Sequence, residues 1–410
     1  MKNKWTLLAF LCATFVVYTV DRALLGPLTI PIQRDTGVTD LEIGILNAAV
    51  FWTYAAIVPL SGYAGDRFNR AKLIGVASVI WSVMTLLTGF ANGFWSLFLL
   101  VSFAVTAPQT IYSPSAVALI AAHHRETRTV ALASHQAAFY IGWLSSGAAV
   151  AAVLAVFGSW RAAYFLFGTV GIVLGVAFIL SARKSAKEPS AAAPKAAKPS
   201  FGRVVKAFFC CPSAIIATLG HVAFTAVAFG YTAWGPAFVS RRFGVSTGAA
   251  GTGVMFWHFA PSFCAILLAG FVTDRLIGRF PRFRLALQAT TLLLAAPVLV
   301  AFGLSDSLAG IWAAAALFGV MRGLFEANSV NSVFDVVPPE CRASAMGFIN
   351  VFAGTLGSLA PMTLGWASEK GGVAALGNGF AWMGAVLVAA SALMCVSLFF
   401  TFNRDRIAKE

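Results

Sequence analysis

Hydrophobic and polar positions form a long-range pattern in this chain, in which apolar stretches of about twenty residues or more alternate with short polar segments. A helix of about 20 apolar residues is long enough to cross a bilayer. The pattern predicts twelve such helices, at about residues 5–32, 42–63, 72–91, 95–120, 129–156, 161–181, 207–240, 248–272, 284–303, 308–335, 343–367 and 377–403. We therefore expect an all-α membrane protein with twelve transmembrane helices.

A segment rich in Ala, Ser, Pro and Lys interrupts this pattern at residues 182–206. Because such a composition cannot bury a core, it predicts a flexible cytoplasmic linker between two six-helix bundles, at 1–181 and 207–403, followed by a tail at 404–410. A charged turn at 62–72 returns in degraded form at 270–279. The repeat indicates two related halves, with a binding site expected at their interface near the membrane midplane.

The composition changes the picture in one respect, because it excludes a soluble protein. Hydrophobic residues make up 59% of the chain, charged residues 11%, and the mean hydropathy is +0.82, whereas soluble proteins carry about 25% charged residues. The net charge of +14 could suggest a nucleic-acid partner, but most of the 29 Lys and Arg residues fall on one side of the predicted membrane. This asymmetry follows the positive-inside rule, so it predicts cytoplasmic termini and no nucleic-acid partner.

The first apolar segment resembles a secretory signal, because Lys2 and Lys4 precede it. We expect it to be retained, since the apolar run is long, no A-x-A-like site follows, and Asp21 and Arg22 continue the segment. The six cysteines are expected to be free thiols. Their spacing predicts no metal site, and no cofactor is expected.

Two charges near the middle of the first predicted helix are the main functional candidates in the first half. Asp21 and Arg22 would be costly at that depth unless they face a cavity or a partner, and Tyr18 lies one turn before Arg22. We interpret Asp21 as a proton-coupling residue, with Tyr18 and Arg22 binding an anionic substrate. The alternative is a structural ion pair that holds this helix against a neighbour.

The second half offers a similar pair in the tenth predicted helix. Arg322 and Glu326 are four residues apart, so they share a helix face and can pair. We interpret Arg322 as a substrate contact and Glu326 as a second proton-coupling residue, the alternative being an internal ion pair. Other polar residues in predicted helices are candidate substrate contacts, although a lone histidine there is more often a packing residue: Gln109, Tyr112, His221, Tyr231, Trp257, His258 and Asn328.

The charged turn and its copy resemble the loop signature of the major facilitator superfamily. The runs Y-T-V-D-R at 18–22 and G-Y-A-G-D-R-F-N-R at 62–70 are similar to patterns of spinster-like transporters, and the first is shared with anion:cation symporters for hexuronates, sugar acids and sialic acid. The resemblance implies that Asp66 and Asp274 latch the cytoplasmic side during transport. The gating residues that it implies are Gly62, Gly65, Asp66, Arg67, Arg70, Asp274 and Arg275.

One departure from those relatives concerns the fourth helix, where they carry an Arg and a Glu. This chain has Ser102 and Gln109 at the corresponding positions, so the two-carboxylate coupling scheme does not carry over directly.

The sequence therefore predicts a secondary transporter, namely a proton-coupled symporter of a small organic anion that works by alternating access. We expect it in a bacterial inner membrane, as a monomer, with the substrate, protons and membrane lipid as its partners. A spinster-like lysolipid carrier and a non-transporting membrane sensor are the alternatives. An enzyme is not expected, because the sequence has neither a phosphate-binding G-x-x-x-x-G-K-[ST] loop nor a nucleophile–base constellation. We therefore expect no catalytic residues.

Overall fold

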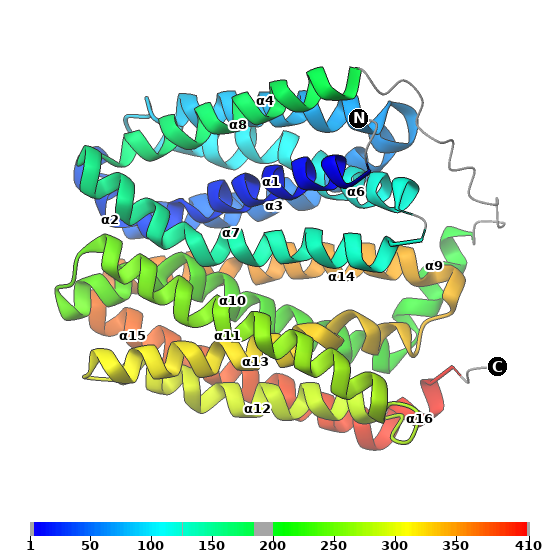
Figure 1. The fold of residues 1–410 in the computed structure, drawn as a ribbon. Coiled ribbons are helices and arrows are strands. Elements are labelled where there is room, and N and C mark those ends of the chain that lie inside the picture. The colour runs from blue at the N-terminus through cyan, green and yellow to red at the C-terminus, as the bar shows by residue number, and fades with distance from the viewer. Residues whose placement is uncertain (1–3, 125, 184–199, 408–410) are drawn as a thin grey trace. The chain divides into compact units, whose positions relative to one another are not determined.

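The computed structural model describes residues 4–124, 126–183 and 200–407, apart from the side chains at 59–60, 62–67, 182–183, 201 and 343 (Figure 1). These ranges are helical almost throughout and contain no strand. The main helices are α1 (Lys4–Ala23), α2 (Leu25–Thr36), α3 (Asp40–Arg67), α4 (Arg70–Thr88), α6 (Thr106–His123), α7 (Arg128–Phe157), α8 (Trp160–Arg183), α10 (Pro212–Phe243), α11 (Thr247–Leu276), α12 (Phe283–Leu304), α13 (Leu308–Phe334), α14 (Arg342–Gly357) and α15 (Leu359–Val396). Shorter elements are α5 (Phe94–Leu97), the π-helix η1 (Phe98–Val105), α9 (Phe201–Phe209), the 3₁₀-helix η2 (Pro339–Cys341), the π-helix η3 (Ser397–Thr401) and α16 (Phe402–Asp405).

In the described part of the chain, 11 helical stretches are long and apolar enough to cross a membrane. The last of them, Ser344–Asp405, has 62 residues, enough for two crossings. Gly372 lies inside it with a φ of 63°, a left-handed conformation that glycine adopts without strain and that turns the chain between two helices. The expectation of an all-α membrane protein is thereby confirmed.

The first predicted helix is broken after its charged pair. α1 ends at Ala23 and α2 begins at Leu25. Pro27 explains the break, because it has no N–H to donate to the carbonyl of Ala23, four residues earlier. The break places Asp21 and Arg22 at the end of a helix rather than in the middle of one.

The fourth predicted helix is also irregular, because it runs as α5, η1 and α6. Pro108 removes a helical hydrogen bond just after the π-helical turns of η1. Within η1, the hydroxyl of Ser102 is buried and donates to the carbonyl of Leu46 at 3.2 Å. The residue at the relatives' arginine position therefore serves a helix–helix contact.

The chain divides into two compact units, which differ from the two expected bundles. The first contains Met1–Ala193 and Thr232–Phe256, and the second contains Pro194–Tyr231 and Trp257–Glu410. The end of α10 and the start of α11 thus belong to the first unit. Residues 184–199 of the expected linker lie outside the described residues, and its last part, from Phe201, is helical in α9.

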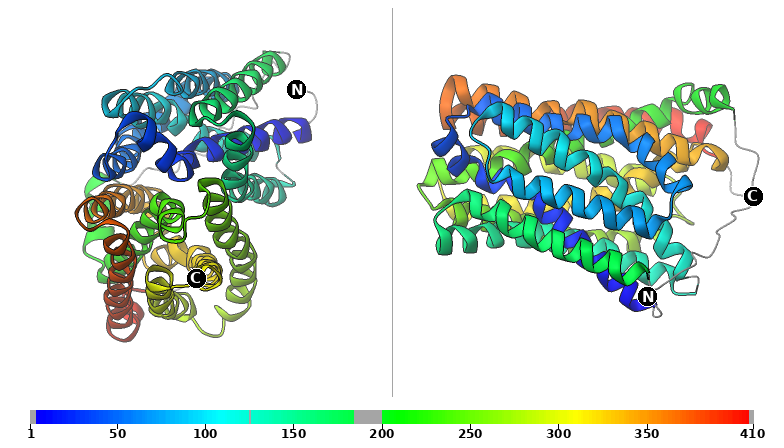
Figure 2. Two further views of the ribbon diagram at one scale, coloured as in Figure 1. Left: turned by 90° about the vertical axis from the view of Figure 1, so that its left-hand side faces the viewer. Right: turned by 90° about the horizontal axis from the view of Figure 1, so that it is seen from above.

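In the first unit, α4 lies beside α8 and α1 beside α7, and α6 packs against α3 and α4 (Figures 1 and 2). Small residues allow the α10–α11 hairpin to join this unit closely. A Cβ on Gly26 would lie 2.6 Å from the carbonyl oxygen of Thr232, and one on Gly251 would lie 3.0 Å from the Cβ of Pro27. A larger side chain at Gly26 would therefore force the hairpin away.

In the second unit, α12 lies beside both α13 and α15. A Cβ on Gly384 would be only 2.8 Å from the carbonyl oxygen of Ala296, so α12 and α15 meet at backbone distance. At the end of the unit where the chain leaves α13, Arg284 pairs with Asp335 at 2.8 Å. The same Asp335 accepts a backbone hydrogen bond from Ile407, which holds the C-terminal segment in place.

Candidate functional site

Asp21 is held by two neutral side chains from other helices. Its Oδ2 accepts hydrogen bonds from Thr85 Oγ1 of α4 at 2.8 Å and from Gln109 Nε2 of α6 at 2.9 Å. Both donors are almost completely buried. Among the described side chains no ion pair joins Asp21 to a neighbouring helix, and its partners there are the two neutral donors.

Thr85 was not foreseen from the sequence. A single threonine in an apolar helix carries no signal, since its hydroxyl can bond to its own helix. Gln109 was predicted to contact the substrate, and in the structure its side-chain amide donates to Asp21 Oδ2. Its direct contact with a substrate stays a prediction.

Arg22 lies among aromatic rings. Its Nη1 donates to the hydroxyl of Tyr18 at 3.2 Å, and its guanidinium carbon lies 5.8 Å from the ring centre of Tyr18, 5.5 Å from that of Phe51 and 5.2 Å from that of Tyr54. Within the described side chains it has no carboxylate partner. We call Tyr18, Phe51 and Tyr54 the aromatic cage.

Two residues of the cage, Phe51 and Tyr54, were missed in the sequence. They are three residues apart on α3 and therefore share a face, which is the one signal that could have identified them. Such cation–π contacts stabilise a buried guanidinium without neutralising its charge.

Tyr112 supports this region from the interior of the first unit. It is fully buried, its hydroxyl donates to the carbonyl of Leu11 at 2.6 Å, and the same hydroxyl lies 3.1 Å from His135 Nε2. Its ring packs against those of Phe15 and Tyr18. The contacts are those of a packing residue, and binding of a substrate by Tyr112 stays a prediction.

The second unit brings together three of the predicted residues. Arg322 Nε donates to Glu326 Oε1 at 2.9 Å, and Arg322 Nη1 lies 3.2 Å from His258 Nε2. The guanidinium also lies 4.7 Å from the ring centre of Phe259. Arg322 therefore differs from Arg22, because a carboxylate already neutralises it, as in the internal ion pair that the sequence left open.

The position of Arg322 fixes the tautomer of His258. A guanidinium can only donate hydrogen bonds, so His258 Nε2 accepts and the ring proton is assigned to Nδ1. His258 is fully buried, and its Nδ1 finds no hydrogen-bond partner among the described residues. Its ring lies 4.7 Å from that of Tyr231 and 5.0 Å from that of Phe318, so Tyr231 belongs to the same cluster.

The remaining candidates of the second unit are His221, Trp257 and Asn328. His221 packs near the ring of Phe325 at 6.4 Å, and the side-chain amide of Asn328 donates to Thr273 Oγ1 at 3.1 Å, joining α13 to α11. Trp257 is 42% exposed, unlike its buried neighbour His258. Substrate contacts by His221, Trp257 and Asn328 stay predictions.

Much of the gating motif lies outside the described part of the chain. The side chains of Asp66 and Arg67, and the surroundings of Gly62 and Gly65, are not described. The backbone there continues α3 as far as Arg67. Asn69 caps α4 by accepting a hydrogen bond from the backbone N–H of Lys72 at 2.9 Å, and Arg70 is the first residue of that helix. Most of the expected turn is therefore helical.

The second copy of the motif is fully described. α11 continues to Leu276, so Asp274 and Arg275 form its last turn. The guanidinium of Arg275 lies 3.8 Å from the ring centre of Phe271, and Asp274 is exposed. The gating role of both residues stays a prediction.

A polar network that was not foreseen closes one end of the first unit. Arg241 near the end of α10 pairs with Asp40 at 2.7 Å and donates to Gln33 Oε1 at 2.7 Å. Nearby in the same unit, Asp35 accepts from Trp160 Nε1 at 3.0 Å and pairs with Arg161. The hydrogen bonds from Trp160 and then Arg161 lower the pKa of the Asp35 carboxyl.

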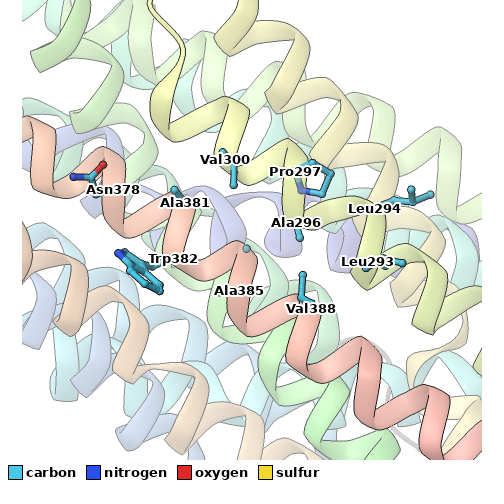
Figure 3. Close-up of a pocket in the computed structure, with 11 residues that line it drawn as sticks. Leu293, Leu294, Ala296, Pro297, Val300, Asn378, Ala381, Trp382, Ala385 and Val388 are labelled. Atoms are coloured by element: carbon cyan, nitrogen blue, oxygen red, sulfur yellow. The ribbon is translucent and has the colours of Figure 1, made fainter.

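An apolar groove in the second unit, of about 690 Å³, contains none of the predicted site residues (Figure 3). It lies between α12 and α15, with Trp382, Leu293, Leu294, Val300 and Val388 as its walls. These side chains are exposed, as expected for helix faces that contact lipid. Among the described residues, no group of three His, Cys, Asp or Glu could hold a metal ion.

Comparison with known proteins identifies relatives over most of the chain. Residues 10–362 match the family described as Major Facilitator Superfamily. An MFS-type efflux pump of Mycolicibacterium smegmatis is 26% identical over 381 residues, which cover 90% of this chain and 85% of that protein. The hexuronate transporter of Bacillus subtilis is 24% identical over 381 residues, covering 90% of this chain and 89% of that protein.

Solved structures agree on the fold. A bacterial homolog to the human lysosomal transporter spinster, in an inward-facing and unoccupied conformation, matches with a TM-score of 0.88 and 20% identity, covering 100% of both chains.

Proposed function

This chain belongs to the major facilitator superfamily and is an integral membrane protein, and from that premise we propose that it is a proton-coupled symporter of a small organic anion. The substrate class is a sugar acid or another carboxylate, and the two six-helix halves of the chain work by alternating access in a bacterial inner membrane. The observation that carries this proposal is Arg22, a cation at the end of a membrane-spanning helix that has no carboxylate partner among the described side chains.

The first step concerns the charge of Arg22. A charge in a membrane-spanning segment is costly. Asp21, the preceding residue, carries the opposite charge, but no hydrogen bond or ion pair joins its side chain to Arg22, and the aromatic cage stabilises the guanidinium without neutralising it. A guanidinium binds a carboxylate through two parallel hydrogen bonds. Among the described side chains the Arg22 guanidinium donates one hydrogen bond, to Tyr18, so donors remain for a substrate carboxylate.

The second step concerns the proton. Asp21 and Arg22 together carry no net charge, so an anion that binds at Arg22 would leave one uncompensated negative charge. A proton on Asp21 restores neutrality, and Thr85 and Gln109 cannot do so because both are neutral. Anion and proton are therefore expected to enter together. The same balance applies at Arg322, where a bound anion would require a proton on Glu326.

The test is transport into proteoliposomes with an acidic exterior, using a panel of carboxylates that includes hexuronates. Wild-type protein should accumulate a carboxylate against its gradient. Arg22→Ala should weaken binding of that substrate by about 30-fold or more, since loss of one partner of a buried charge pair costs about 2–5 kcal/mol. Arg203→Ala is the matched control, because Arg203 is 64% exposed and pairs with Glu340 outside the spanning helices.

Wild-type affinity in Arg22→Ala would remove this arginine from the binding site and contradict the proposal.

Export is the second candidate, because a relative that covers 90% of this chain is called an efflux pump. An antiporter would expel the substrate towards the acidic side instead of accumulating it with the proton. Saturable binding without accumulation in either direction would indicate a sensor. Accumulation of lysolipids alone would indicate the amphiphile carrier.

A further inference from the structure

A basic pocket of about 520 Å³ lies in the second unit, where the turn between α11 and α12 meets the C-terminal segment. Its lining residues are Arg279, Phe280, Pro281, Arg282, Asn403 and Arg406. Its volume falls in the range of small-molecule sites, about 300–1,000 Å³. The pocket contains none of the residues assigned to transport above.

Three cations line this pocket without a carboxylate partner among the described side chains: Arg279, Arg282 and Arg406. The neighbouring carboxylate, Asp405, already accepts hydrogen bonds from Arg404 at 3.0 Å and from the backbone N–H of Ser213 at 3.1 Å. Like charges so close repel one another, which an anion between them would relieve.

The pocket is held in shape from two sides. Arg282 Nε donates to Asn403 Oδ1 at 2.8 Å, which joins the turn to α16. The backbone N–H of Ile407 donates to the carbonyl of Asp335 at 3.0 Å, which fixes the chain next to Arg406. These two contacts hold the turn and the C-terminal segment on opposite sides of the pocket.

The pocket also lies at the ends of two helices that are long and apolar enough to span a membrane. Arg279 follows the end of α11 by three residues and Arg282 directly precedes α12, and both helices are long and apolar enough to span. Phe280, between the two arginines, is 52% exposed. An exposed aromatic ring among long basic side chains suits the boundary between headgroups and acyl chains.

We propose that this pocket binds the phosphate of an anionic phospholipid headgroup. Guanidinium groups bind phosphate oxygens bidentately, and basic pockets at the ends of spanning helices suit anionic headgroups. Phe280 supplies the apolar contact that distinguishes a lipid from soluble phosphate. The proposal is independent of the transported substrate.

The test measures thermal unfolding of the purified full-length protein in detergent, titrated with phosphatidylglycerol, phosphatidylcholine or inorganic phosphate. Phosphatidylglycerol should raise the unfolding temperature by mass action, whereas the other two should not at matched concentrations. Each arginine near an anionic lipid contributes about fivefold in affinity (about 1 kcal/mol), so Arg279→Gln, Arg282→Gln and Arg406→Gln together should weaken binding about 100-fold.

Arg404→Gln is the matched control, since it removes a 68% exposed arginine next to the pocket that does not line it. If the triple variant fails to fold, Arg406→Gln alone still tests the pocket, because it leaves the turn between α11 and α12 unchanged. This single variant should weaken binding of phosphatidylglycerol about fivefold. Equal binding of phosphatidylglycerol by wild type and by Arg406→Gln would overturn the proposal. Equal stabilisation by phosphatidylcholine or by inorganic phosphate would overturn the assignment to an anionic lipid.

Discussion

At the scale of single residues, the two arginines of the spanning helices differ in how their charge is compensated. Arg322 is neutralised by Glu326, whereas Arg22 is surrounded by the aromatic cage. The guanidinium of Arg322 already pairs with a carboxylate of its own helix, whereas that of Arg22 forms no such pair among the described side chains and can pair with an anionic ligand. We therefore place the anion at Arg22 in the first unit.

Asp21 should separate substrate exchange from proton coupling. Asp21→Asn keeps the size of the side chain and an acceptor oxygen for Thr85 and Gln109, but it cannot take up a proton. Exchange of labelled substrate across proteoliposomes should persist, and accumulation driven by a pH gradient should be lost. If accumulation stays pH-driven in Asp21→Asn, coupling resides elsewhere, with Glu326 as the next candidate.

His258 should matter as a hydrogen-bond acceptor for Arg322. His258→Phe removes the acceptor and should lower stability by about 1–3 kcal/mol, the cost of leaving a buried donor unsatisfied. His258→Gln can still offer an acceptor oxygen and should lose less. Thermal unfolding of both variants checks this order, and equal losses would show that only the packing of the ring counts.

At the scale of helices, the breaks follow from proline and coincide with the site. Pro27 ends α1 just after Arg22, and Pro108 follows the π-helical segment η1 just before Gln109. Interrupted helices leave backbone polar groups free and occur in transporters where a cavity is lined. Asp21 and Gln109, which are joined by a hydrogen bond, both lie next to such a break.

The contacts of Asp35, which join α2 to the start of α8, should make stability depend on acid. Its folded-state pKa is lowered by hydrogen bonds from Trp160 and Arg161, so its contribution to stability is present above the unfolded pKa of about 3.9 and is lost as pH falls through the folded value. Between the unfolded and the folded pKa of Asp35, the unfolding temperature of Asp35→Asn should therefore fall less steeply with decreasing pH than that of the wild-type protein. An unchanged acid profile in Asp35→Asn would contradict this contribution.

At the scale of the whole molecule, the compact units do not follow the division into two halves of the sequence. The tip of the α10–α11 hairpin belongs to the first unit, held by Arg241 on Asp40 and by close glycine contacts. In a transporter that works by alternating access, such a contact has to break and re-form during each cycle.

A double-mutant cycle measures that contact. Asp40→Ala and Arg241→Ala each remove one partner of a half-buried pair, and the coupling energy between them should be about 1–3 kcal/mol in thermal or chemical unfolding. Arg203→Ala with Glu340→Ala, an exposed pair, is the control and should couple by less than about 1 kcal/mol. Strict additivity of the Asp40 and Arg241 variants would mean that the pair does not hold the hairpin.

The sequence by itself determined the number and approximate position of the spanning helices, because the length of an apolar stretch is a local property. It also determined the pair of Arg322 and Glu326, since residues four apart meet on one helix face. Only the tertiary structure decided the partners of Asp21 and Arg22. Thr85 and Gln109 lie 64 and 88 residues away from Asp21 and are neutral, so neither spacing nor charge pattern could have indicated them.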